Sequence, residues 1–485
     1  MSTADYTKKN RSFNNKAAFL FLAGACLFVQ AGCMVGPNYQ PPEQNVPSQW
    51  SGKTSPQTSP ADATLLQWWK EFNDPNLTSL VERAFKSNLD LKQAGERIRQ
   101  ARAARGVVGA GFWPTADATG SLSRSRTPAS GGVPAKTTNL FQAGLDAAWE
   151  LDIFGGTRRN IEAADADILA AVEDRRDVLV TLACEVAINY IELRGFQQEI
   201  IIANSNLKAQ QNSADVVHKR YVGGFAGALD MANANAQVAT TLSQIPLIET
   251  SAQQTIYTIS VLLGQQPESL LEELSPTSSI PLKPPEIPAG LPSEILRRRP
   301  DIRRAEAQVH SATALIGVAV SDLFPKFNLA GSLSFRGENS KTFRWEDRFW
   351  SWGPAIDWQI FSAGRVQSNI EVRKALQQQA ILEYKKTVLT ALQDVENALV
   401  AYSNEHQRCK SLIDAVSENR KAIELSTKLY IAGQTDFLSV LDAQRSLYSS
   451  EDALVQSTRN LSMDLVLLYK ALGGGWDITS EDVNP

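Results

Sequence analysis

Histidine and cysteine, the residues most often found in metal and catalytic sites, are scarce in this chain of 485 residues. The three histidines, at positions 218, 310 and 406, lie far apart in sequence and have no second ligand nearby. Neither a glycine-rich phosphate loop nor a Ser/His/Asp set can be picked out. The sequence therefore predicts a protein that is not an enzyme and that binds no cofactor or metal. Only a catalytic site assembled by folding from distant residues would escape this argument.

An excess of charge of one sign is also absent. Lysine and arginine number 48 against 52 aspartates and glutamates, which gives a formal net charge of −4, and no basic block stands out. A nucleic-acid-binding surface would need such a block. We therefore expect no nucleic acid partner.

Apolar runs long enough to cross a bilayer as a helix are missing as well. The run at residues 17–29 is too short to do so, but it follows four basic residues and is typical of a secretory signal. Small residues then lead to Cys33, which is similar to the acylated first residue of bacterial lipoproteins and is predicted to begin the mature chain. Gln30 replaces the usual aliphatic residue of such signals, so ordinary cleavage nearby without a lipid is the alternative.

What the chain does contain is a second copy of itself. Residues 90–123 align with residues 301–334 without a gap, and later positions align at nearly the same offset. An offset that drifts by only a few residues indicates a duplicated structural unit with insertions confined to the connections. The matched pairs include Gly106 and Gly317, Pro114 and Pro325, Arg158 and Arg365, Tyr221 and Tyr430, Gly224 and Gly433, and Leu263 and Leu472.

The duplication sets the expected domain boundaries. We predict a signal peptide at 1–32, a lipidated extended segment at 33–75, a first repeat at 76–270, a proline-rich linker at 271–292, a second repeat at 293–475 and a tail at 476–485. Cys26 would be removed with the signal. Cys184 and Cys409 are not equivalent in the repeat, and we expect them to pack in helices rather than to form a disulfide or a ligand pair.

Each repeat contains two segments in which apolar and polar residues alternate, as in strands with one face of each kind. They lie near 115–127 and 138–154 in the first repeat, and near 326–336 and 349–361 in the second. In a soluble sandwich the polar face would meet bulk water. In an exported chain, four strands of about ten residues with tryptophans near their ends favour a transmembrane barrel with a polar lumen. Four strands are too few to close such a barrel, so the sequence predicts one shared among chains.

A very long helix is expected after each pair of strands. Residues 157–221 and 365–430 contain no proline, and at about 1.5 Å per residue each stretch would form roughly 100 Å of helix. Shorter helices are expected near 78–112 and 293–323. The predicted fold class is therefore mainly α with a membrane β-barrel segment, each half being a helix, a hairpin, a long helix and a returning helix.

Several motifs resemble those of a known family, the TolC-like outer-membrane efflux proteins, and in particular the OprM-like lipoproteins of tripartite pumps. The resemblance covers essentially the whole mature chain. The motifs are Cys33 to Tyr39, Trp68-Trp69 with Phe72 to Pro75, Arg299 to Ile302, and Tyr430 to Gln444.

This resemblance implies a homotrimer with a shared, roughly 12-stranded barrel in outer-membrane lipid and a hollow helical barrel that crosses the periplasm. It implies an exit duct that passively conducts small molecules such as drugs or other toxic compounds. The implied partners are a periplasmic adaptor and an inner-membrane transporter of the RND type. The long helices end at glycine turns, so we expect the adaptor to dock at Gly223, Gly224, Gly433 and Gln434.

The resemblance also implies a gate at the periplasmic end. In OprM-like proteins a leucine and an aspartate narrow that end, and the matching positions are Leu438 and Asp442, four residues apart on one helix face. Three leucines would form a dry constriction, and three converging carboxylates would select cations. Some relatives carry a second aspartate where this chain has Ser439, so the acidic ring would be single here. The alternative is that Leu438 packs between helices and Asp442 is a solvated or capping acid.

Other functions were weighed against efflux. A duct for type I protein secretion would have the same architecture, but the lipoprotein-like start favours small-molecule efflux. A periplasmic scaffold or adhesin would be released by salt rather than by detergent. A cytosolic coiled-coil scaffold would explain the helices but neither the export signal nor the strands.

Overall fold

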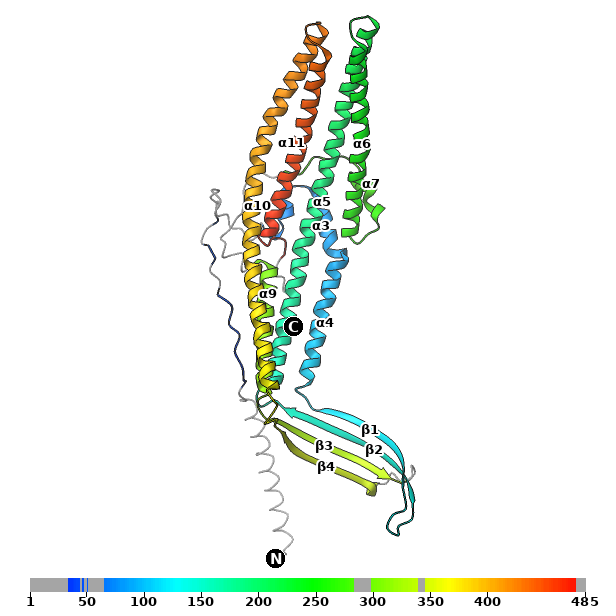
Figure 1. Cartoon of the computed structure of the whole chain (residues 1–485), viewed down its shortest axis with the longest axis vertical. Coiled ribbons are helices and arrows are strands. Elements are labelled where there is room, and N and C mark those ends of the chain that lie inside the picture. The colour runs from blue at the N-terminus through cyan, green and yellow to red at the C-terminus, as the bar shows by residue number, and fades with distance from the viewer. Residues whose placement is uncertain are drawn as a thin grey trace, which may run out of the picture. The chain divides into compact units, whose positions relative to one another are not determined.

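The computed structural model describes residues 34–43, 46–47, 50, 65–282, 298–338 and 345–476 (Figure 1). The predicted signal peptide, Cys33 and most of the predicted tail lie outside these described residues. The chain divides into two compact units. The first contains 34–43, 98–170 and 305–384, and the second contains 65–97, 171–304 and 385–476, apart from the undescribed residues.

The two halves repeat one order of elements (Figure 1). In the first half these are α3 (Pro75–Ser87), α4 (Leu89–Ala110), β1 (Thr115–Thr127), β2 (Lys136–Leu151), α5 (Gly156–Val222) and α6 (Ala228–Leu262). In the second they are α9 (Pro300–Ser321), β3 (Lys326–Gly337), β4 (Arg348–Asp357), α10 (Arg365–Ile431) and α11 (Phe437–Ala471). Short turns of helix are η1 (Trp68–Phe72), η2 (Pro267–Leu270), α7 (Leu271–Leu274) and η3 (Trp345–Asp347).

The lengths of the helices confirm the duplication. Helices α5 and α10 each contain 67 residues, and the returning helices α6 and α11 each contain 35. The predicted order of helix, hairpin, long helix and returning helix is thus confirmed in both halves. Among the residues that the structure describes, no helix is both long enough and apolar enough to cross a membrane.

The four strands form one antiparallel sheet in the order β1-β2-β3-β4. Strands β1 and β4 are its two edges, each paired on one side only. The apolar side chains predicted to share a face remain exposed, among them Leu145, Trp350 and Trp352. A single chain therefore presents an uncovered apolar face together with two open edges.

Two strands end earlier than the alternation predicts. The predicted strand to residue 154 ends at Leu151, because Asp152 turns to cap α5 and Gly155 adopts a left-handed φ of 79°. The predicted strand to residue 361 ends at Asp357. There the Trp358 ring nitrogen donates to the Leu323 carbonyl oxygen at 3.1 Å, which draws the chain back toward the helical side.

The expected helix near 78–112 is divided at Asn88. This residue has an extended ψ of 137°, and its side-chain oxygen accepts the Leu91 backbone N–H at 2.9 Å, so it ends α3 and caps α4. Its amide nitrogen donates to the Leu262 carbonyl oxygen at 2.9 Å. A tertiary contact with the end of α6 thus fixes a break that periodicity alone does not reveal.

The core of the second unit is built around aromatic residues. Trp68 is fully buried and stacks on Tyr469 with ring centroids 5.4 Å apart. The guanidinium groups of Arg176 and Arg303 contact the Trp476 ring, at 4.7 and 5.4 Å from its centroid. These contacts join residues of η1, α5, α9 and α11, so the middle of the helical region is packed as one core.

Candidate functional site

The two long helices end in turns of the same backbone geometry. At the first turn Gly224 has a φ of 78° and the Phe225 N–H donates to the Arg220 carbonyl oxygen at 2.7 Å. At the second, Gly433 has a φ of 73° and the Gln434 N–H donates to the Leu429 carbonyl oxygen at 2.9 Å. Both are Schellman-type ends, in which a left-handed glycine lets the chain reverse. The structure therefore places the predicted docking residues at the two turns.

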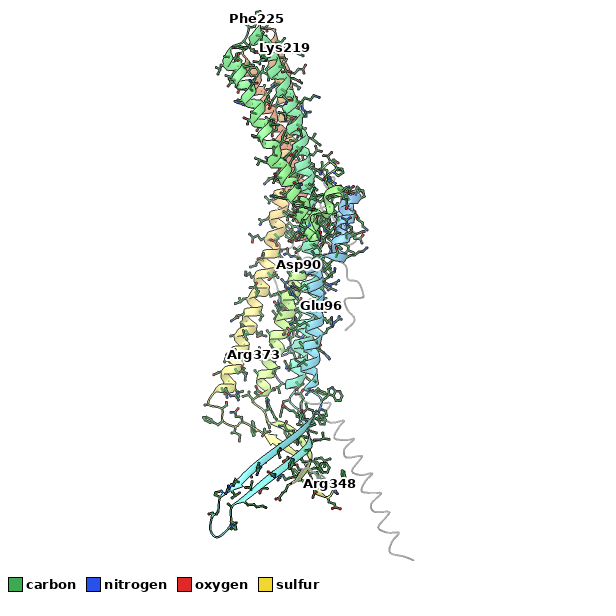
Figure 2. All side chains as sticks on the ribbon, turned by 90° about the vertical axis from the view of Figure 1, so that its right-hand side faces the viewer. Asp90, Glu96, Lys219, Phe225, Arg348 and Arg373 are labelled. Atoms are coloured by element: carbon green, nitrogen blue, oxygen red, sulfur yellow. The ribbon has the colours of Figure 1, made fainter. Side chains whose placement is uncertain are left out.

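The side chains at these turns differ. Figure 2 shows Phe225 and Lys219 at the end of the α5–α6 pair. Phe225 is 78% exposed there, and Val222 and Leu229 beside it are also exposed. The second turn presents Gln434 and the N-cap residue Asp436, both exposed. Ile431 and Leu438, the repeat equivalents of Val222 and Leu229, are exposed as well, so the two turns differ mainly in having Phe225 at the first and Gln434 at the second.

Asp436 begins α11 and engages Ser439. Its carboxylate accepts the Ser439 hydroxyl at 2.8 Å and the Ser439 backbone N–H at 3.1 Å. These bonds favour the ionised carboxylate and lower the pKa of Asp436. Asp436 is therefore the capping acid of this helix, and Ser439 supports it.

Leu438 and Asp442, the predicted gate residues, lie on the exposed face of α11. Leu438 is 52% exposed and Asp442 is also exposed. The opposite face is buried in a cluster formed by Val217, Ala234, Tyr430, Phe437, Val440 and Leu441. Within one protomer, Leu438 is about half exposed and the cap of α11 is Asp436. The exposure of Asp442 fits both a gate residue and the alternative of a solvated acid. Both side chains are free to line a channel or to meet another protomer.

Polar contacts join the helix pair α5–α6 to the helix pair α10–α11. The Arg220 guanidinium donates to the carbonyl oxygens of Tyr430 at 2.8 Å and Ile431 at 3.0 Å, and lies 4.6 Å from the Tyr430 ring centroid. Further along, Arg445 donates to the Gln237 side chain at 2.9 Å and Tyr448 to the Gln244 side chain at 3.2 Å. Sequence reasoning missed these residues. The sequence held one signal. In the alignment of the two repeats Arg220 corresponds to Leu429, so the two halves differ at this position.

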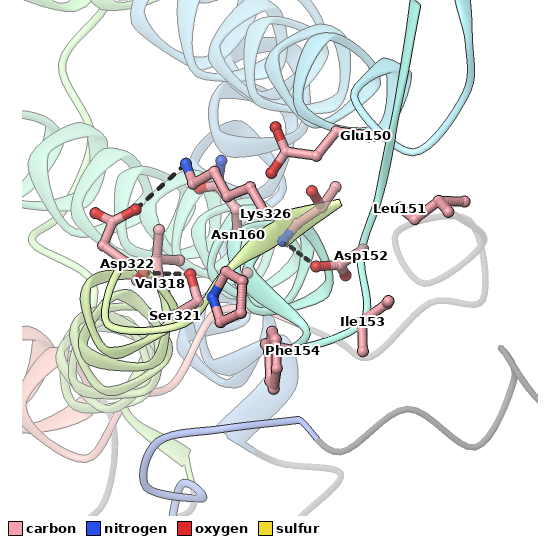
Figure 3. Close-up of a pocket in the computed structure, with 13 residues that line it drawn as sticks. Glu150, Leu151, Asp152, Ile153, Phe154, Asn160, Val318, Ser321, Asp322 and Lys326 are labelled. Carbon is pink, nitrogen blue, oxygen red and sulfur yellow. Dashed lines mark hydrogen bonds and ion pairs between the residues drawn. The ribbon is translucent and has the colours of Figure 1, made fainter. Parts of the chain in front are cut away.

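A polar pocket of about 170 Å³ lies where the sheet meets the helices of the first unit (Figure 3). On one side Asp152 caps α5 by accepting the backbone N–H groups of Thr157 at 3.0 Å and Arg158 at 2.9 Å. On the other side Lys326 pairs with Asp322 at 3.3 Å. The two pairings engage Asp152, Asp322 and Lys326 at the junction between strand and helix, and Glu150 also lines the pocket.

The structure also locates the residues weighed for chemistry. Cys184 is buried and Cys409 half-buried, and both are free thiols. Burial raises the pKa of the Cys184 thiol to about 11, which keeps it protonated and unreactive at neutral pH. Within the described residues, no group of three or more His, Cys, Asp or Glu side chains is arranged to hold a metal ion.

Comparison with known proteins supplies the family context. A family model described as outer membrane efflux protein matches residues 80–265 and 291–474. Nodulation protein T of Rhizobium leguminosarum bv. trifolii is 32% identical over 448 residues, which cover 92% of this chain and 95% of that protein. The pyoverdine export outer membrane protein OpmQ of Pseudomonas aeruginosa is 35% identical over 464 residues, which cover 94% and 97%.

A solved structure gives the same picture in three dimensions. The outer-membrane channel OprN superimposes with a TM-score of 0.85 at 35% sequence identity, covering 92% of this chain and all of that one. The two segments matched by the family model correspond closely to the two structural repeats.

Proposed function

The chain belongs to the outer membrane efflux protein family and is the outer-membrane channel of an efflux system. From this premise we propose that three copies of the chain together form the exit duct for small molecules. Members of this family are homotrimers that work with adaptor and inner-membrane pump partners. The pump of this chain is of the RND type, and the adaptor connects that pump to the channel. Efflux, rather than type I protein secretion, is supported by the family description itself.

The observation that carries the proposal is the open four-stranded sheet. Its edges β1 and β4 each have one unpaired side, and its apolar face is exposed. In lipid, unpaired backbone groups cost several kcal/mol each, so the edges must pair with those of other chains. Three sheets joined edge to edge give a closed barrel of about twelve strands.

Mass measurement in detergent tests this assembly. We expect the purified protein to be a trimer that dissociates only when the sheet unfolds. A folded monomer that protects its own strand edges from hydrogen exchange would contradict the proposal.

The helix turns carry the adaptor site in this proposal. The exposed Val222, Phe225 and Leu229 of the first turn, and the exposed Gly433 and Gln434 of the second, support docking at the ends of the two helix pairs. Cross-linking probes placed at Phe225 and Gln434 should capture the adaptor. Capture only by probes in the hairpin loop at 128–135 would contradict it.

Leu438 and Asp442 form the gate in this proposal. Their shared exposed face on α11 supports a ring of three leucines above or below a ring of three carboxylates. Apolar rings exclude water and carboxylate rings favour cations, so such a constriction would close the resting channel to large solutes.

Cys33 carries the lipid in this proposal, and the sheet supplies most of the membrane affinity. A fatty-acid probe should label the wild-type chain and not Cys33→Ser, which should still reach the outer membrane in part. Several apolar strand faces bury far more area than acyl chains alone, and this is why partial retention is expected.

A further inference from the structure

The seam between two protomers of the proposed trimer can be derived from the duplication, because each half of the chain supplies the same two strands. Lys326 at the start of β3 is the repeat equivalent of Thr115 at the start of β1. Lys326 pairs with Asp357 in β4, and Thr115 pairs with Ala148 in β2. Strand β3 thus repeats β1 at an offset of 211 residues (326 − 115), and β4 repeats β2 at an offset of 209 (357 − 148). Pairing of β4 with β1 of another protomer therefore repeats the pairing of β2 with β3 inside one chain.

Aromatic residues beside the sheet indicate that this repetition extends across the seam. Inside the chain, Phe154 after β2 stacks on Phe324 before β3, with ring centroids 4.5 Å apart. The repeat equivalents of these residues are Phe361 after β4 and Trp113 before β1. In a single chain Phe361 is 84% exposed and Trp113 is 69% exposed. A seam of the same geometry stacks Phe361 on Trp113 of the partner subunit, so it covers two large apolar side chains that one chain leaves exposed.

The same repetition fixes which residues meet at the end of the sheet remote from the helices (Figure 1). Inside the chain, two pairs on the apolar face carry no charge: Phe141 with Gly337, and Ala143 with Phe335. Their equivalents across the seam each join a tryptophan of β4 to an arginine of β1: Trp350 with Arg126, and Trp352 with Arg124. All four of these side chains are exposed in a single chain. The seam between chains thus combines cations with aromatic rings where the seam within the chain is uncharged.

Arg124 and Arg126 lie on the apolar, lipid-facing side of β1. They follow Leu122, which pairs with Phe141, at every second residue, and alternate residues of a strand share a face. A charged side chain on the lipid face is costly at the middle of the bilayer and costs little near its surfaces. At about 3.3 Å per residue and a tilt near 40°, Arg124 lies roughly 23 Å from Thr115 along the membrane normal. This is close to the height of the apolar band of such barrels, so both arginines reach the headgroups of the leaflet remote from the helices.

Acidic side chains leave the two arginines unneutralised. Within the described part of the chain neither arginine forms an ion pair. At the same end of the sheet Glu338 pairs with Lys136 at 3.5 Å. Glu346 and Asp347 of η3 fall beyond the end of β1 in the derived register. Each seam therefore has two unneutralised positive charges at the level of the lipid headgroups.

We propose that each seam of the trimer binds the phosphate group of a membrane lipid in the leaflet remote from the helices. Arg124 and Arg126 of one protomer hold the phosphate, and Trp352 and Trp350 of the partner subunit hold the arginines. A guanidinium that lies flat on an indole ring keeps the N–H groups of its edge free, and these match two oxygens of a phosphate. The inference rests on the proposed trimer, because a single chain does not contain the whole site. Since the lipid binds the trimer and not separate protomers, it also stabilises the trimer against dissociation.

Paired cysteines test the register in the full-length protein. Ser125→Cys with Ser351→Cys places two thiols directly opposite one another across the derived seam. Ser123→Cys with Ser351→Cys is the matched control, displaced by two residues and therefore farther apart. We expect oxidation to cross-link protomers several-fold more in the first variant, with each single variant as the control for the chain's own cysteines. More cross-linking in the displaced pair would overturn the register and the site with it.

Native mass spectrometry of purified trimers tests the ligand, with three probes: lipid A that carries two phosphates, dephosphorylated lipid A and inorganic phosphate. We expect wild-type trimers to bind the phosphorylated lipid, and Arg124→Gln with Arg126→Gln to lower its affinity about tenfold or more. Trp350→Leu with Trp352→Leu keeps the charges and removes the stacking, so its loss should be smaller. Arg336→Gln removes an arginine at the same end of the sheet but on the polar face, and it should bind the lipid as wild type does.

The comparison of the probes on wild-type trimers needs no variant. Equal binding of phosphorylated and dephosphorylated lipid A would overturn the inference, and so would inorganic phosphate that displaces the lipid at similar concentrations. An equal loss in Arg336→Gln would assign the effect to overall charge and not to the seam. Trimers that bind no lipid would remove the site and leave the channel intact, whereas a wild-type chain that forms no trimer would contradict the proposed assembly itself.

Discussion

The two helix pairs of this chain have the same backbone and different side chains. Helices α5–α6 and α10–α11 have equal lengths and end in the same type of glycine turn. Yet Tyr430 is 5% exposed and packs under Arg220, whereas its repeat equivalent Tyr221 is 44% exposed. Duplication preserved the turn and left single positions on its surface free to diverge, with Phe225 at the first turn where the second has Gln434.

The largest effect is expected at the gate. Replacing Leu438 and Asp442 with alanine together should raise the single-channel conductance of the trimer several-fold and admit large antibiotics in a strain without a pump, because both rings of the proposed constriction disappear. Conductance in planar bilayers measures the first effect. Asp442→Asn alone should weaken cation preference more than conductance, since it removes charge and keeps volume.

The first repeat supplies the control for the gate. Leu229 is the repeat equivalent of Leu438, is also exposed and sits one turn from its own glycines. Leu229→Ala should leave conductance unchanged. Equal conductance in wild type and the double gate variant would place the constriction elsewhere on the helices.

The next largest effect is expected from exchanging the turn surfaces. Phe225→Gln gives the first turn the residue found at the equivalent second-turn position, Gln434. Losing the burial of one phenylalanine costs about 1.5–3 kcal/mol, so adaptor affinity should fall about tenfold or more while the trimer stays intact. Binding of the purified adaptor to trimers in detergent measures it. Unchanged affinity, with a loss instead in the reciprocal Gln434→Phe variant, would assign docking to the second turn.

A smaller effect is expected at the contact between the pairs. Arg220→Gln removes two hydrogen bonds to the end of α10 and the stacking on Tyr430, a net cost of about 1–2 kcal/mol for a charged donor. The helix pair α10–α11 should then be held less firmly against α5–α6. We expect faster proteolysis near residue 431 and a modest rise in the conductance of the trimer. Lys219→Gln, the adjacent exposed position, is the control. If proteolysis is faster by the same factor in both variants, the contact of Arg220 with the end of α10 has no specific role.

These contacts mark where sequence reasoning stops. Alternation around Trp350 predicted the strands and the lack of proline predicted the long helices, because both signals are local. The break at Asn88 depends on the Leu262 carbonyl, and Arg159 donates to the side chain of Asn38, more than a hundred residues away in sequence. Pairings over such distances are set by tertiary packing. The gate positions came from resemblance, and the exposure of Leu438 could not be derived from composition.

The smallest effect concerns an acid that only the second pair carries. Asp464 on α11 stands where the first pair has Thr255, whose hydroxyl is satisfied by the Ser251 carbonyl oxygen at 2.8 Å. Burial, and then the charge of Glu405, raise the pKa of Asp464 to about 6. An ordinary aspartate in the unfolded chain titrates near pH 4. The folded state therefore binds the proton more tightly, and the ionised carboxylate opposes folding.

It follows that the penalty is absent below about pH 4, grows between about pH 4 and 6, and is complete above pH 6. For a half-buried group it amounts to about 1 kcal/mol per protomer after allowing for screening by solvent. Asp464→Thr should therefore raise the melting temperature of the trimer by about one degree at pH 8 and not at pH 4. The reciprocal Thr255→Asp should lower it at pH 8 and recover toward pH 4, and Asp414→Asn, at an exposed site on α10, should do neither. If Asp464→Thr still raises the melting temperature at pH 4, the effect comes from packing and not from the charge of Asp464. The two helix pairs would then differ at this position in shape and not in charge.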